Sequence, residues 1–402
     1  MTAWLNVVGI GEDGLSGLGQ WARIAVEDCD ILFGAQRHLA MVPERAGQER
    51  IAWPSPFAAA FDLVLARRGQ SVCILASGDP MMYGIGASLA RRLDLAEMRV
   101  WPHPSAFSLA AARLGWPLQD CTLLTVHGRP LELVVPHLAP AARLLILAED
   151  GTSPAKLAAL LCQHGFGASR ISVLERLDGP AERRLDGQAL GWPAERCADL
   201  NVMAVECQAD RSGAALPILA GLPDEAFAHD GQLTKRDIRA VTLARLAPLA
   251  GQLLWDVGAG CGSVAVEWMR SHPRCRAIAI EAKPHRLALI EENRLKLGVP
   301  GLTVLAGKAP IALAGLEAPD AVFIGGGLTV KGLVEACWSA LKPGGRLVAN
   351  AVTLQGEAVL AELYGRLGGE MTRISVAHAA ALGGFDGWRT AMPVTMLAVV
   401  KP

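Results

Sequence analysis

The chain has 402 residues, of which 51% are hydrophobic and 19% charged, and its formal net charge at pH 7 is -1. This length allows two or three domains, and this hydrophobic content excludes a disordered protein. A charge so close to zero disfavours nucleic acid or an anionic membrane as partners, because both select a strongly basic face.

The nine cysteines are scattered along the chain, and none forms a Cys-x-x-Cys pair. We therefore expect reduced thiols, with no metal site and no disulfide framework. The N-terminus lacks a basic stretch followed by a long apolar core, and no apolar run is long enough to span a bilayer. These features predict a cytoplasmic protein that has no membrane partner.

The first predicted strand, Leu5–Val8, runs into a glycine turn, and a second strand, Val72–Ala76, precedes the segment Ser77–Pro80. Glycines let a ligand approach the backbone closely, and an Asp-Pro step fixes a rigid turn. Taken alone, the two loops predict a ligand site of unspecified kind. Its candidate contacts are Gly9, Gly11, Gly78, Asp79 and Pro80.

A helix is predicted directly after Pro102–Ser105, because apolar residues recur there at helical spacing from Phe107 to Leu114. Ser105 is its expected N-cap, and Gly115 is its expected end. Strands and helical patterns alternate through most of the chain, which is typical of an α/β architecture. The next predicted strands are Thr122–Val126, Leu144–Leu147, Ile171–Leu174 and Val202–Val205.

A domain boundary is predicted near residues 208–222, where a polar segment is followed by Gly/Pro breaks. We assign residues 1–210 to a first domain, with lobes of about 1–115 and 116–210, and residues 211–402 to a second. Helices are expected between the first five strands of the second domain. Its predicted strands are Leu253–Val257, Ala277–Ile280, Thr303–Leu305, Ala321–Ile324, Arg346–Ala349 and Thr395–Val400.

The glycine loop after Leu253–Val257 is the most specific feature of the second domain. Its Gly-x-Gly-x-Gly spacing favours an adenosyl sulfonium donor, S-adenosylmethionine, over the pyrophosphate of a dinucleotide. Glu281 ends the next strand, where a carboxylate can accept hydrogen bonds from both ribose hydroxyls. Alternatively, Glu281 only caps the following helix. The loop consists of Gly258, Ala259, Gly260, Cys261 and Gly262.

The adenine end of the donor is expected between Ala309, in the turn after the third strand, and Thr234. The Asn/Asp-Pro-Pro-aromatic tetrad of amide and amine methylases is absent after the fourth strand, where Gly325–Gly327 stands instead. Three glycines leave an open floor for a bulky, flat acceptor. The alternative is a plain flexible loop.

Further motifs carry a resemblance to two known families. The first half resembles the class III tetrapyrrole methylases of corrin synthesis, in Gly9–Gly11, Ser77–Pro80, His103–Phe107, Ala111–Gly115, His127–Arg129 and Glu149–Gly151. The second half is similar to the class I corrin methyltransferases, in His229–Arg236, Gly258–Gly262, Gly307–Pro310 and Asn350–Leu354. The resemblance implies a two-lobed class III tetrapyrrole methylase fold fused to a class I Rossmann-like methyltransferase fold.

The same resemblance implies a bifunctional enzyme of cobalamin biosynthesis. It would bind S-adenosylmethionine at two sites, one in each domain, and methylate precorrin-6B. The first domain would methylate carbon 5, and the second would methylate carbon 15 and remove carbon dioxide from the ring C acetate, giving precorrin-8. The family pattern carries donor contacts onto Thr234, the glycine loop, Glu281 and Ala309. A homo-oligomer is also expected.

A polycarboxylate acceptor calls for basic groups in its pocket. The candidates are His127, Arg129, Lys235, Arg236 and Lys308, although surface cations are usually just solvated. His229 and Asp230 are candidates for proton handling, or a loop histidine bonded to backbone. Two other functions stay open: a different small-molecule acceptor, and a first half that binds substrate without catalysis.

Overall fold

The structure is a computed structural model that describes residues 3–211 and 215–402. The chain divides into two compact units that meet along the sequence at Ala215 and Leu216. This point falls within the boundary region predicted near residues 208–222. Residues 212–214, which belong to that predicted boundary, lie outside the described residues.

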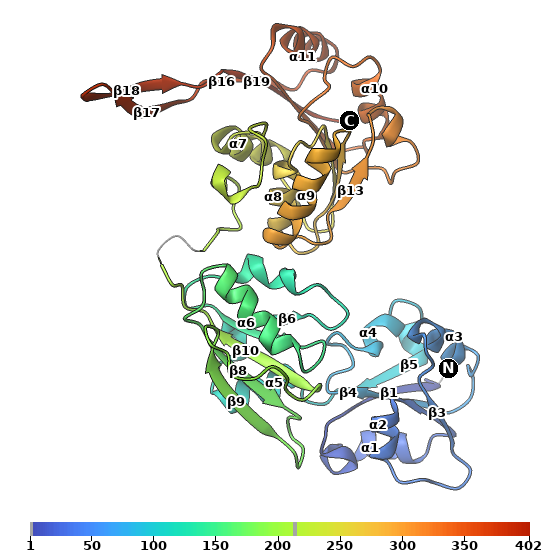
Figure 1. The fold of residues 1–402 in the computed structure, drawn as a ribbon. Coiled ribbons are helices and arrows are strands. Elements are labelled where there is room, and N and C mark those ends of the chain that lie inside the picture. The colour runs from blue at the N-terminus through green and yellow to red at the C-terminus, as the bar shows by residue number, and fades with distance from the viewer. Residues whose placement is uncertain (1–2, 212–214) are drawn as a thin grey trace. The chain divides into compact units, whose positions relative to one another are not determined.

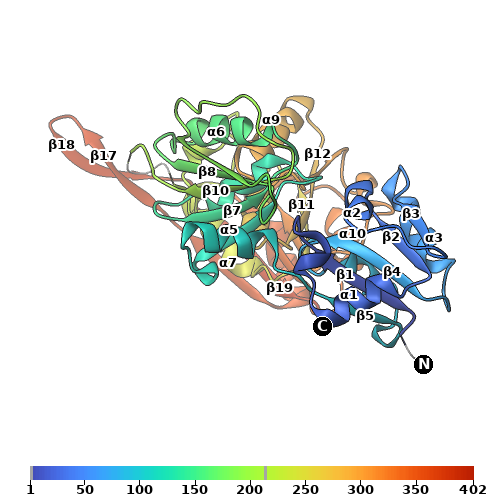
Figure 2. The ribbon, with the colours of Figure 1, turned by 90° about the horizontal axis from the view of Figure 1, so that it is seen from below.

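The first unit begins with a five-stranded sheet in which every strand pair is parallel (Figure 2). Its order is β3 (Glu49–Ala52), β2 (Ile31–Gly34), β4 (Val72–Ser77), β1 (Leu5–Ile10) and β5 (Met98–Trp101). The helices are α1 (Gln20–Glu27), α2 (Gln36–Ala40), α3 (Ala60–Leu65) and α4 (Ile85–Leu89). Strands β1 and β4 are apolar nearly throughout because parallel strands are covered on both faces. Both strands were predicted.

A second five-stranded sheet completes the first unit. Its order is β6 (Cys121–Thr125), β7 (Arg143–Leu147), β10 (Asn201–Glu206), β8 (Arg170–Glu175) and β9 (Arg183–Gln188). Helix α5 (Ala106–Leu114) precedes the sheet, and α6 (Ser153–Gln163) follows β7. The prediction for α5 is confirmed, because the Ser105 hydroxyl accepts from the backbone N–H of Ser108 and Gly115 adopts a left-handed φ of 66°.

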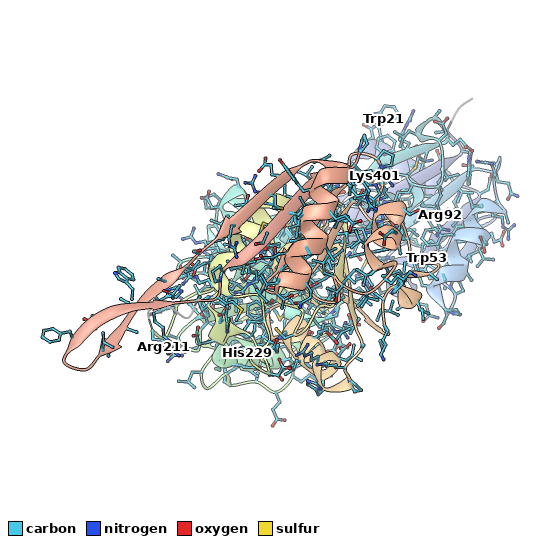
Figure 3. The ribbon with its side chains drawn as sticks, turned by 90° about the horizontal axis from the view of Figure 1, so that it is seen from above. Trp21, Trp53, Arg92, Arg211, His229 and Lys401 are labelled. Carbon is cyan, nitrogen blue, oxygen red and sulfur yellow. The ribbon has the colours of Figure 1, made fainter. Side chains whose placement is uncertain are left out.

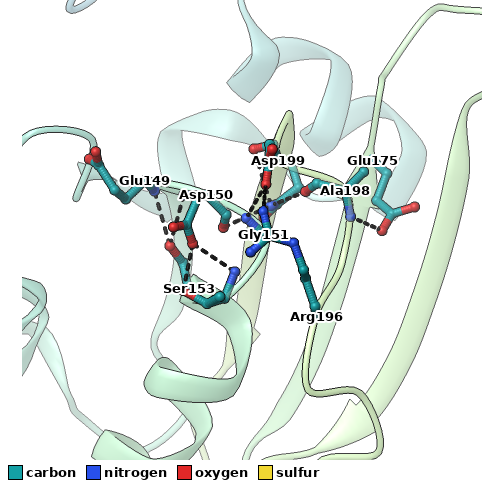
Figure 4. A network of polar contacts seen from close by, with 10 residues as sticks. Glu149, Asp150, Gly151, Ser153, Glu175, Arg196, Ala198 and Asp199 are labelled. Carbon is teal, nitrogen blue, oxygen red and sulfur yellow. Dashed lines mark hydrogen bonds and ion pairs between the residues drawn. The ribbon is translucent and has the colours of Figure 1, made fainter.

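The Glu149–Gly151 motif forms part of a polar network that ties the end of β7 to the start of α6 (Figure 4). The Ser153 hydroxyl accepts from the backbone N–H groups of Glu149 and Asp150, at 3.1 and 3.2 Å. The Gly151 N–H donates to Asp199, which also pairs with Arg196 at 2.6 Å. These bonds satisfy backbone donors at the helix start, so the motif has a clear structural role.

The second unit is built on a seven-stranded sheet whose first five strands are parallel (Figure 1). Its order is β13 (Thr303–Ala306), β12 (Arg276–Glu281), β11 (Leu253–Val257), β14 (Ala321–Ile324), β15 (Arg346–Ala351), β19 (Val394–Val400) and β16 (Glu370–Ile374). The order reverses at β11, so the edge of the sheet beyond β11 and β14 is a topological switch point, where such sheets bind ligands.

Five helices accompany this sheet: α7 (Arg236–Leu246), α8 (Ser263–Arg270), α9 (Pro284–Lys296), α10 (Leu333–Ala340) and α11 (Leu354–Leu367). The prediction of a helix in every connection is wrong for the link from β13 to β14. That fully described link has one 3-10 turn, Ile311–Leu313, because Pro310, Gly315 and Pro319 break up the segment. Within residues 3–211 and 215–402, no helix is long and apolar enough to cross a membrane.

A hairpin of β17 (Ala377–Leu382) and β18 (Phe385–Thr390) separates β16 from β19. It extends away from the sheet of its own unit (Figure 1). Most of its residues are exposed, and Leu382, Phe385 and Trp388 are between 71% and 84% accessible. These strands, together with β2, β3, β5, β9 and β16, were not predicted from the sequence.

Candidate functional site

A cavity of about 1230 Å³ opens in the second unit at the carboxyl ends of β11, β12 and β14. It exceeds the range of roughly 300–1,000 Å³ common for a single small-molecule pocket. The glycine loop and Glu281 line one part of the cavity, and the base of the β17–β18 hairpin lines another. The cavity therefore has room for a donor and a bulky acceptor together.

Glycine is required in the loop after β11 because two backbone segments almost touch there. Gly258 has a φ of 71°, and a Cβ on it would lie 2.9 Å from the N, Cα and O atoms of Gly326. A side chain at position 258 would be strained and would push the two loops apart. This close approach connects the predicted Gly325–Gly327 floor to the glycine loop, and backbone atoms of both loops line the cavity.

Glu281 is 6% exposed and faces the cavity from the end of β12. One carboxylate oxygen accepts from the Gly260 N–H at 2.9 Å, and the other accepts from the N–H groups of Ala282 and Lys283 at 2.8 and 2.9 Å. Glu281 thus holds the glycine loop and also satisfies donors just ahead of α9. These bonds are those expected if Glu281 caps the following helix. Ribose binding by the same carboxylate stays a prediction.

Asp256 lies buried beneath the glycine loop, outside the cavity lining, and sequence reasoning missed it. It is 1% exposed on β11, and its Oδ2 accepts from the Ala265 N–H at 3.0 Å, which ties α8 to the strand below the glycine loop. Burial raises the pKa of this carboxyl to about 7, and the nearby Glu281 adds to the effect. An acid inside the otherwise apolar run Leu253–Val257 was the signal available in the sequence.

Most of the predicted residues of the second unit line the same cavity. They are Thr234, Lys235, Arg236, Gly258, Ala259, Gly260, Glu281, Lys308 and Ala309. Asn350 also lines it and was missed as a site residue. Its amide NH₂ donates to the Thr242 hydroxyl at 2.9 Å, whereas its Oδ1 is buried without a hydrogen-bond partner among the described residues. A buried acceptor of this kind is costly unless a ligand or water satisfies it.

Cys261 and Gly262 belong to the glycine loop but lie outside the cavity lining. Cys261 is 1% exposed, and its carbonyl accepts from the Asn293 amide at 2.9 Å. Gly262 has a φ of 78° just before α8, and a Cβ there would lie 3.1 Å from Ile290. Both residues therefore contact α9, on the side of the loop away from the cavity. Their contact with the donor stays a prediction.

His229, labelled in Figure 3, lies off the cavity lining in the loop that precedes α7, and Asp230 follows it in the same loop. His229 is exposed, and its Nδ1 accepts from the Gly231 N–H at 3.0 Å. Asp230 accepts from Arg286 at 2.8 Å and lies 3.2 Å from His285. The Arg286 guanidinium holds the pKa of the Asp230 carboxyl well below its usual range. This geometry suits a residue that fixes the loop better than one that exchanges protons.

The predicted loops of the first unit come together around β1. A Cβ on Gly9 would lie 1.9 Å from the Gly78 carbonyl oxygen and 2.8 Å from the backbone nitrogen of His103. A Cβ on Gly11 would lie 2.8 Å from Cε1 of His103. The absence of side chains at both positions thus lets three loops converge at the carboxyl end of the parallel sheet, as a backbone-lined ligand site requires.

His103 and Asp13 add buried polar atoms to this convergence, and sequence reasoning gave neither a role. His103 is 8% exposed, and its Nε2 lies 3.7 Å from Asp13 Oδ1. Within the described part of the chain, neither His103 Nδ1 nor Asp13 Oδ1 has a hydrogen-bond partner, although both atoms are buried. Unsatisfied groups beside a glycine cradle are typical of a site that a ligand completes.

Asp79 and Pro80 build the turn beside Gly78. The Asp79 carboxylate accepts from the Met81 N–H at 2.8 Å, and Pro80 is buried against Gly84 and Gly86. A Cβ on Gly84 would lie 2.5 Å from the Pro80 carbonyl oxygen. The predicted rigid turn is therefore present, whereas donor binding by these residues stays a prediction.

Arg129 reaches the same loop, because its guanidinium carbon lies 5.4 Å above the Tyr83 ring. Tyr83 is 49% exposed and has a left-handed φ of 55°, so the loop presents its ring outward. His127 is exposed and lies 3.6 Å from Glu149, whose carboxylate also accepts from the Gly128 N–H. Of the two predicted basic residues here, Arg129 is the better placed toward the glycine loops.

Known protein families show which class of protein the chain belongs to. Residues 5–196 match the family described as Tetrapyrrole (Corrin/Porphyrin) Methylases, and residues 225–401 match the Precorrin methyltransferase domain. The chain is therefore a methyltransferase of the tetrapyrrole class that uses S-adenosylmethionine. The predicted fold class, a class III tetrapyrrole methylase fold followed by a Rossmann-like class I fold, is confirmed.

Full-length relatives identify the family within this class. The chain is 51% identical over 401 residues to "Precorrin-6Y C(5,15)-methyltransferase [decarboxylating]" of Sinorhizobium sp, covering 100% of the chain and 97% of that protein. It is 44% identical over 400 residues to the protein of the same name from Mycobacterium tuberculosis, covering 98% and 99%. The chain belongs to the family of precorrin-6Y C5,15-methyltransferases (decarboxylating).

A shorter protein and a single solved domain also resemble part of the chain. One is the "Cobalt-precorrin-7 C(5)-methyltransferase" of Salmonella typhimurium, 31% identical over 179 residues, 44% of this chain and 88% of that protein. Among solved structures, the C-terminal domain of precorrin-6Y C5,15-methyltransferase from Rhodobacter capsulatus is 45% identical, with a TM-score of 0.44 over 46% of this chain and 100% of that one.

Proposed function

We propose that the chain transfers methyl groups from S-adenosylmethionine to carbons 5 and 15 of precorrin-6Y and removes carbon dioxide from its ring C acetate. The relatives' names give the acceptor as precorrin-6Y, and we use that name for the acceptor expected above as precorrin-6B. The second unit acts at carbon 15 and in the decarboxylation, and the first unit acts at carbon 5. The cavity of the second unit carries the proposal, because it combines a donor cradle with basic residues.

The donor cradle fits an adenosyl sulfonium ligand. Its Gly258–Gly326 approach leaves no room for a Cβ, and the Glu281 carboxylate, already at the cavity wall, can accept from ribose hydroxyls. Thr234 and Ala309 line the same cavity and flank the adenine in this proposal. When bound, S-adenosylmethionine supplies a methyl group on a positive sulfonium. The chain's own task is to align that methyl group with the acceptor carbon and to exclude water.

The acceptor end of the cavity suits a flat polycarboxylate. Lys235, Arg236, Lys308 and Arg389 line the cavity, and Gly325–Gly327 lines it without side chains. Arginine can bind carboxylates with two parallel hydrogen bonds, which would fix the orientation of the macrocycle as well as its position. Carbon nucleophiles in an electron-rich conjugated ring need no strongly activated protein side chain.

Decarboxylation uses the same conjugation. When the ring C acetate loses carbon dioxide, the electron pair of the broken C–C bond enters the macrocycle, so the substrate acts as its own electron sink. The protein must hold the acetate in place and manage one proton.

The first unit is proposed to hold a second donor site. Support comes from the convergence of Gly9, Gly11 and Gly78 with the buried polar atoms of His103 and Asp13. In this proposal Asp79 and Pro80 shape the donor loop, and Arg129 binds a substrate carboxylate. The carbon-5 methyltransferase from Salmonella typhimurium, which matches 44% of this chain, supports the assignment of one domain-sized part to carbon 5.

We also propose that the chain forms a homo-oligomer. The exposed apolar side chains of the β17–β18 hairpin support this, because large exposed apolar groups tend to be covered in an assembly. Sedimentation equilibrium of the full chain, compared with a Phe385→Ser/Trp388→Ser double variant, tests it. A monomeric wild-type chain would contradict the proposal.

The function is tested by product mass spectrometry with the full chain, precorrin-6Y and S-adenosylmethionine as the only reactants. The proposal requires a product that has gained two methyl groups and lost one carbon dioxide. A Gly258→Ala variant should give a product methylated only at carbon 5, and a Gly9→Ala variant a product methylated and decarboxylated only by the second unit. Unmethylated substrate after incubation with the wild-type chain would refute the function.

A further inference from the structure

The base of the β17–β18 hairpin brings two basic side chains into the cavity of the second unit. His378 lies on β17 and Arg389 on β18, and both line the cavity. They stand directly opposite each other in the antiparallel register. Directly paired residues present their side chains on the same face of the two strands. The hairpin thus adds an imidazole and a guanidinium to the acceptor end of the site.

A carboxylate on another element holds the imidazole. Nε2 of His378 lies 3.2 Å from Oδ2 of Asp237, in the first turn of α7, which also lines the cavity. A protonated imidazole and a carboxylate at this distance form a charge-assisted pair. The pair fixes one ring nitrogen and the orientation of the side chain, and the charged groups around the ring are Asp237 on α7 and Arg389 on β18.

We propose that His378 is the acid that protonates the substrate after decarboxylation, an inference that rests on the function proposed above. The C–C bond between the acetate methylene carbon and its carboxylate breaks, carbon dioxide leaves, and the electron pair passes into the conjugated macrocycle. The electrons then return to the methylene carbon, which takes the proton from the His378 imidazolium. A methyl group forms on ring C, and neutral imidazole remains.

His378 suits this task better than the other side chains on the wall. It is the one histidine among the lining residues that the structure describes. Histidine readily gives and regains protons near neutral pH, whereas Lys and Arg hold theirs too tightly. Glu281 is occupied at the donor end by three backbone N–H groups. His378 is therefore the group whose chemistry matches a single proton delivery.

The position of His378 also lets it recover its proton. Its side chain is 68% exposed, so solvent can reach the imidazole between turnovers. Arg389, its cross-strand partner, is placed to bind a neighbouring carboxylate of the macrocycle and so to keep the reacting edge of the ring beside the hairpin.

The test compares His378→Gln with wild type in the full chain, with precorrin-6Y and S-adenosylmethionine, by measuring carbon dioxide release and methyl transfer separately. General acid catalysis typically contributes about 10²–10⁴-fold, so decarboxylation should slow by about 100-fold or more. Methyl transfer at carbon 15 should stay within about threefold of wild type. Asp237→Asn, which leaves the histidine in place, should slow decarboxylation less. His272→Gln, at a half-buried histidine off the cavity lining, is the matched control and should behave as wild type.

Each outcome separates this inference from the function on which it rests. Unchanged carbon dioxide release in His378→Gln would overturn the proton-donor role, and so would an equal loss of methyl transfer and decarboxylation, which indicates substrate binding or misfolding. Carbon-5 methylation by the same variant reports whether the first unit is intact. If the wild-type chain releases no carbon dioxide, the proposed function fails, whatever the variants do.

Discussion

Replacing Glu281 by glutamine should weaken donor binding to the second unit by roughly 30- to 1,000-fold. Hydrogen bonds to a charged group are each worth about 1.5–3 kcal/mol, and two ribose hydroxyls are expected to donate to this carboxylate. Glutamine keeps one neutral acceptor of similar shape, so the net loss should be about 2–4 kcal/mol. Glutamine can also still accept from the Gly260 N–H, which limits damage to the glycine loop. Alanine would leave three backbone donors unpaired and should abolish carbon-15 methylation outright.

Titration calorimetry of the full chain with S-adenosylhomocysteine, the donor product, measures this effect. The wild-type chain should bind with two components, and only one of them should weaken in Glu281→Gln. Carbon-5 methylation should persist, which serves as an internal control for folding of the first unit. Unchanged donor affinity together with unchanged carbon-15 turnover would refute the ribose assignment and leave Glu281 with the structural role alone.

Three further predictions concern Asp256 and the glycine cradles. The pKa of Asp256 is about 7 in the folded chain against an ordinary 3.8, so its stabilising contribution is present below about pH 4 and is lost as the pH rises through 7. Between about pH 5 and pH 8 this loss is about 3 kcal/mol of unfolding free energy. Asp256→Asn should remove the loss, which thermal unfolding at the two pH values measures. Gly258→Ala should abolish carbon-15 methylation, whereas Gly315→Ala, with a similar φ of 77° but open space around it, should lose only stability, by about 1 kcal/mol. Gly9→Ala should abolish carbon-5 methylation, whereas Gly19→Ala should not, because a Cβ on Gly19 would have no other atom within 4 Å. Equal activity of the two variants in either matched pair would show that the close backbone approaches at Gly9 or Gly258 are not needed for methylation.

Strands β11 to β15 and β19 of the second unit could be predicted because apolar residues dominate their sequences. Leu253–Val257 is apolar except for Asp256, Ala321–Ile324 is apolar throughout, and both runs match the observed β11 and β14. Helix α5 was equally clear, because its cap Ser105 and its terminal Gly115 flank an apolar stripe. These elements depend on local chemistry and on burial that repeats with a regular period.

The β17–β18 hairpin could not be predicted, because its residues are mostly exposed and carry no buried alternation. The same hairpin supplies His378 and Arg389 to the cavity. Because the hairpin was not predicted, these two residues of the site were not predicted either. Asp256 and Asn350 were missed because their roles come from burial, which only the packed structure reveals.

The role of His229 and Asp230 in proton handling stays a prediction. His229 and Asp230 lie close to Thr234 in the chain, and this suggested a shared site. In the structure, Asp230 is held by Arg286 and His285, and the cavity is lined by Pro223–Glu225 before these two residues and by Gly231 after them.

The central claim is that one chain holds two separate donor sites, and donor stoichiometry tests it most directly. Equilibrium dialysis of the full chain against labelled S-adenosylhomocysteine should give two equivalents per chain at saturation. Gly9→Ala and Gly258→Ala should each retain one equivalent, and the double variant none. A single equivalent in the wild-type chain, lost on Gly258→Ala and kept on Gly9→Ala, would contradict the account and leave the first unit without a donor site.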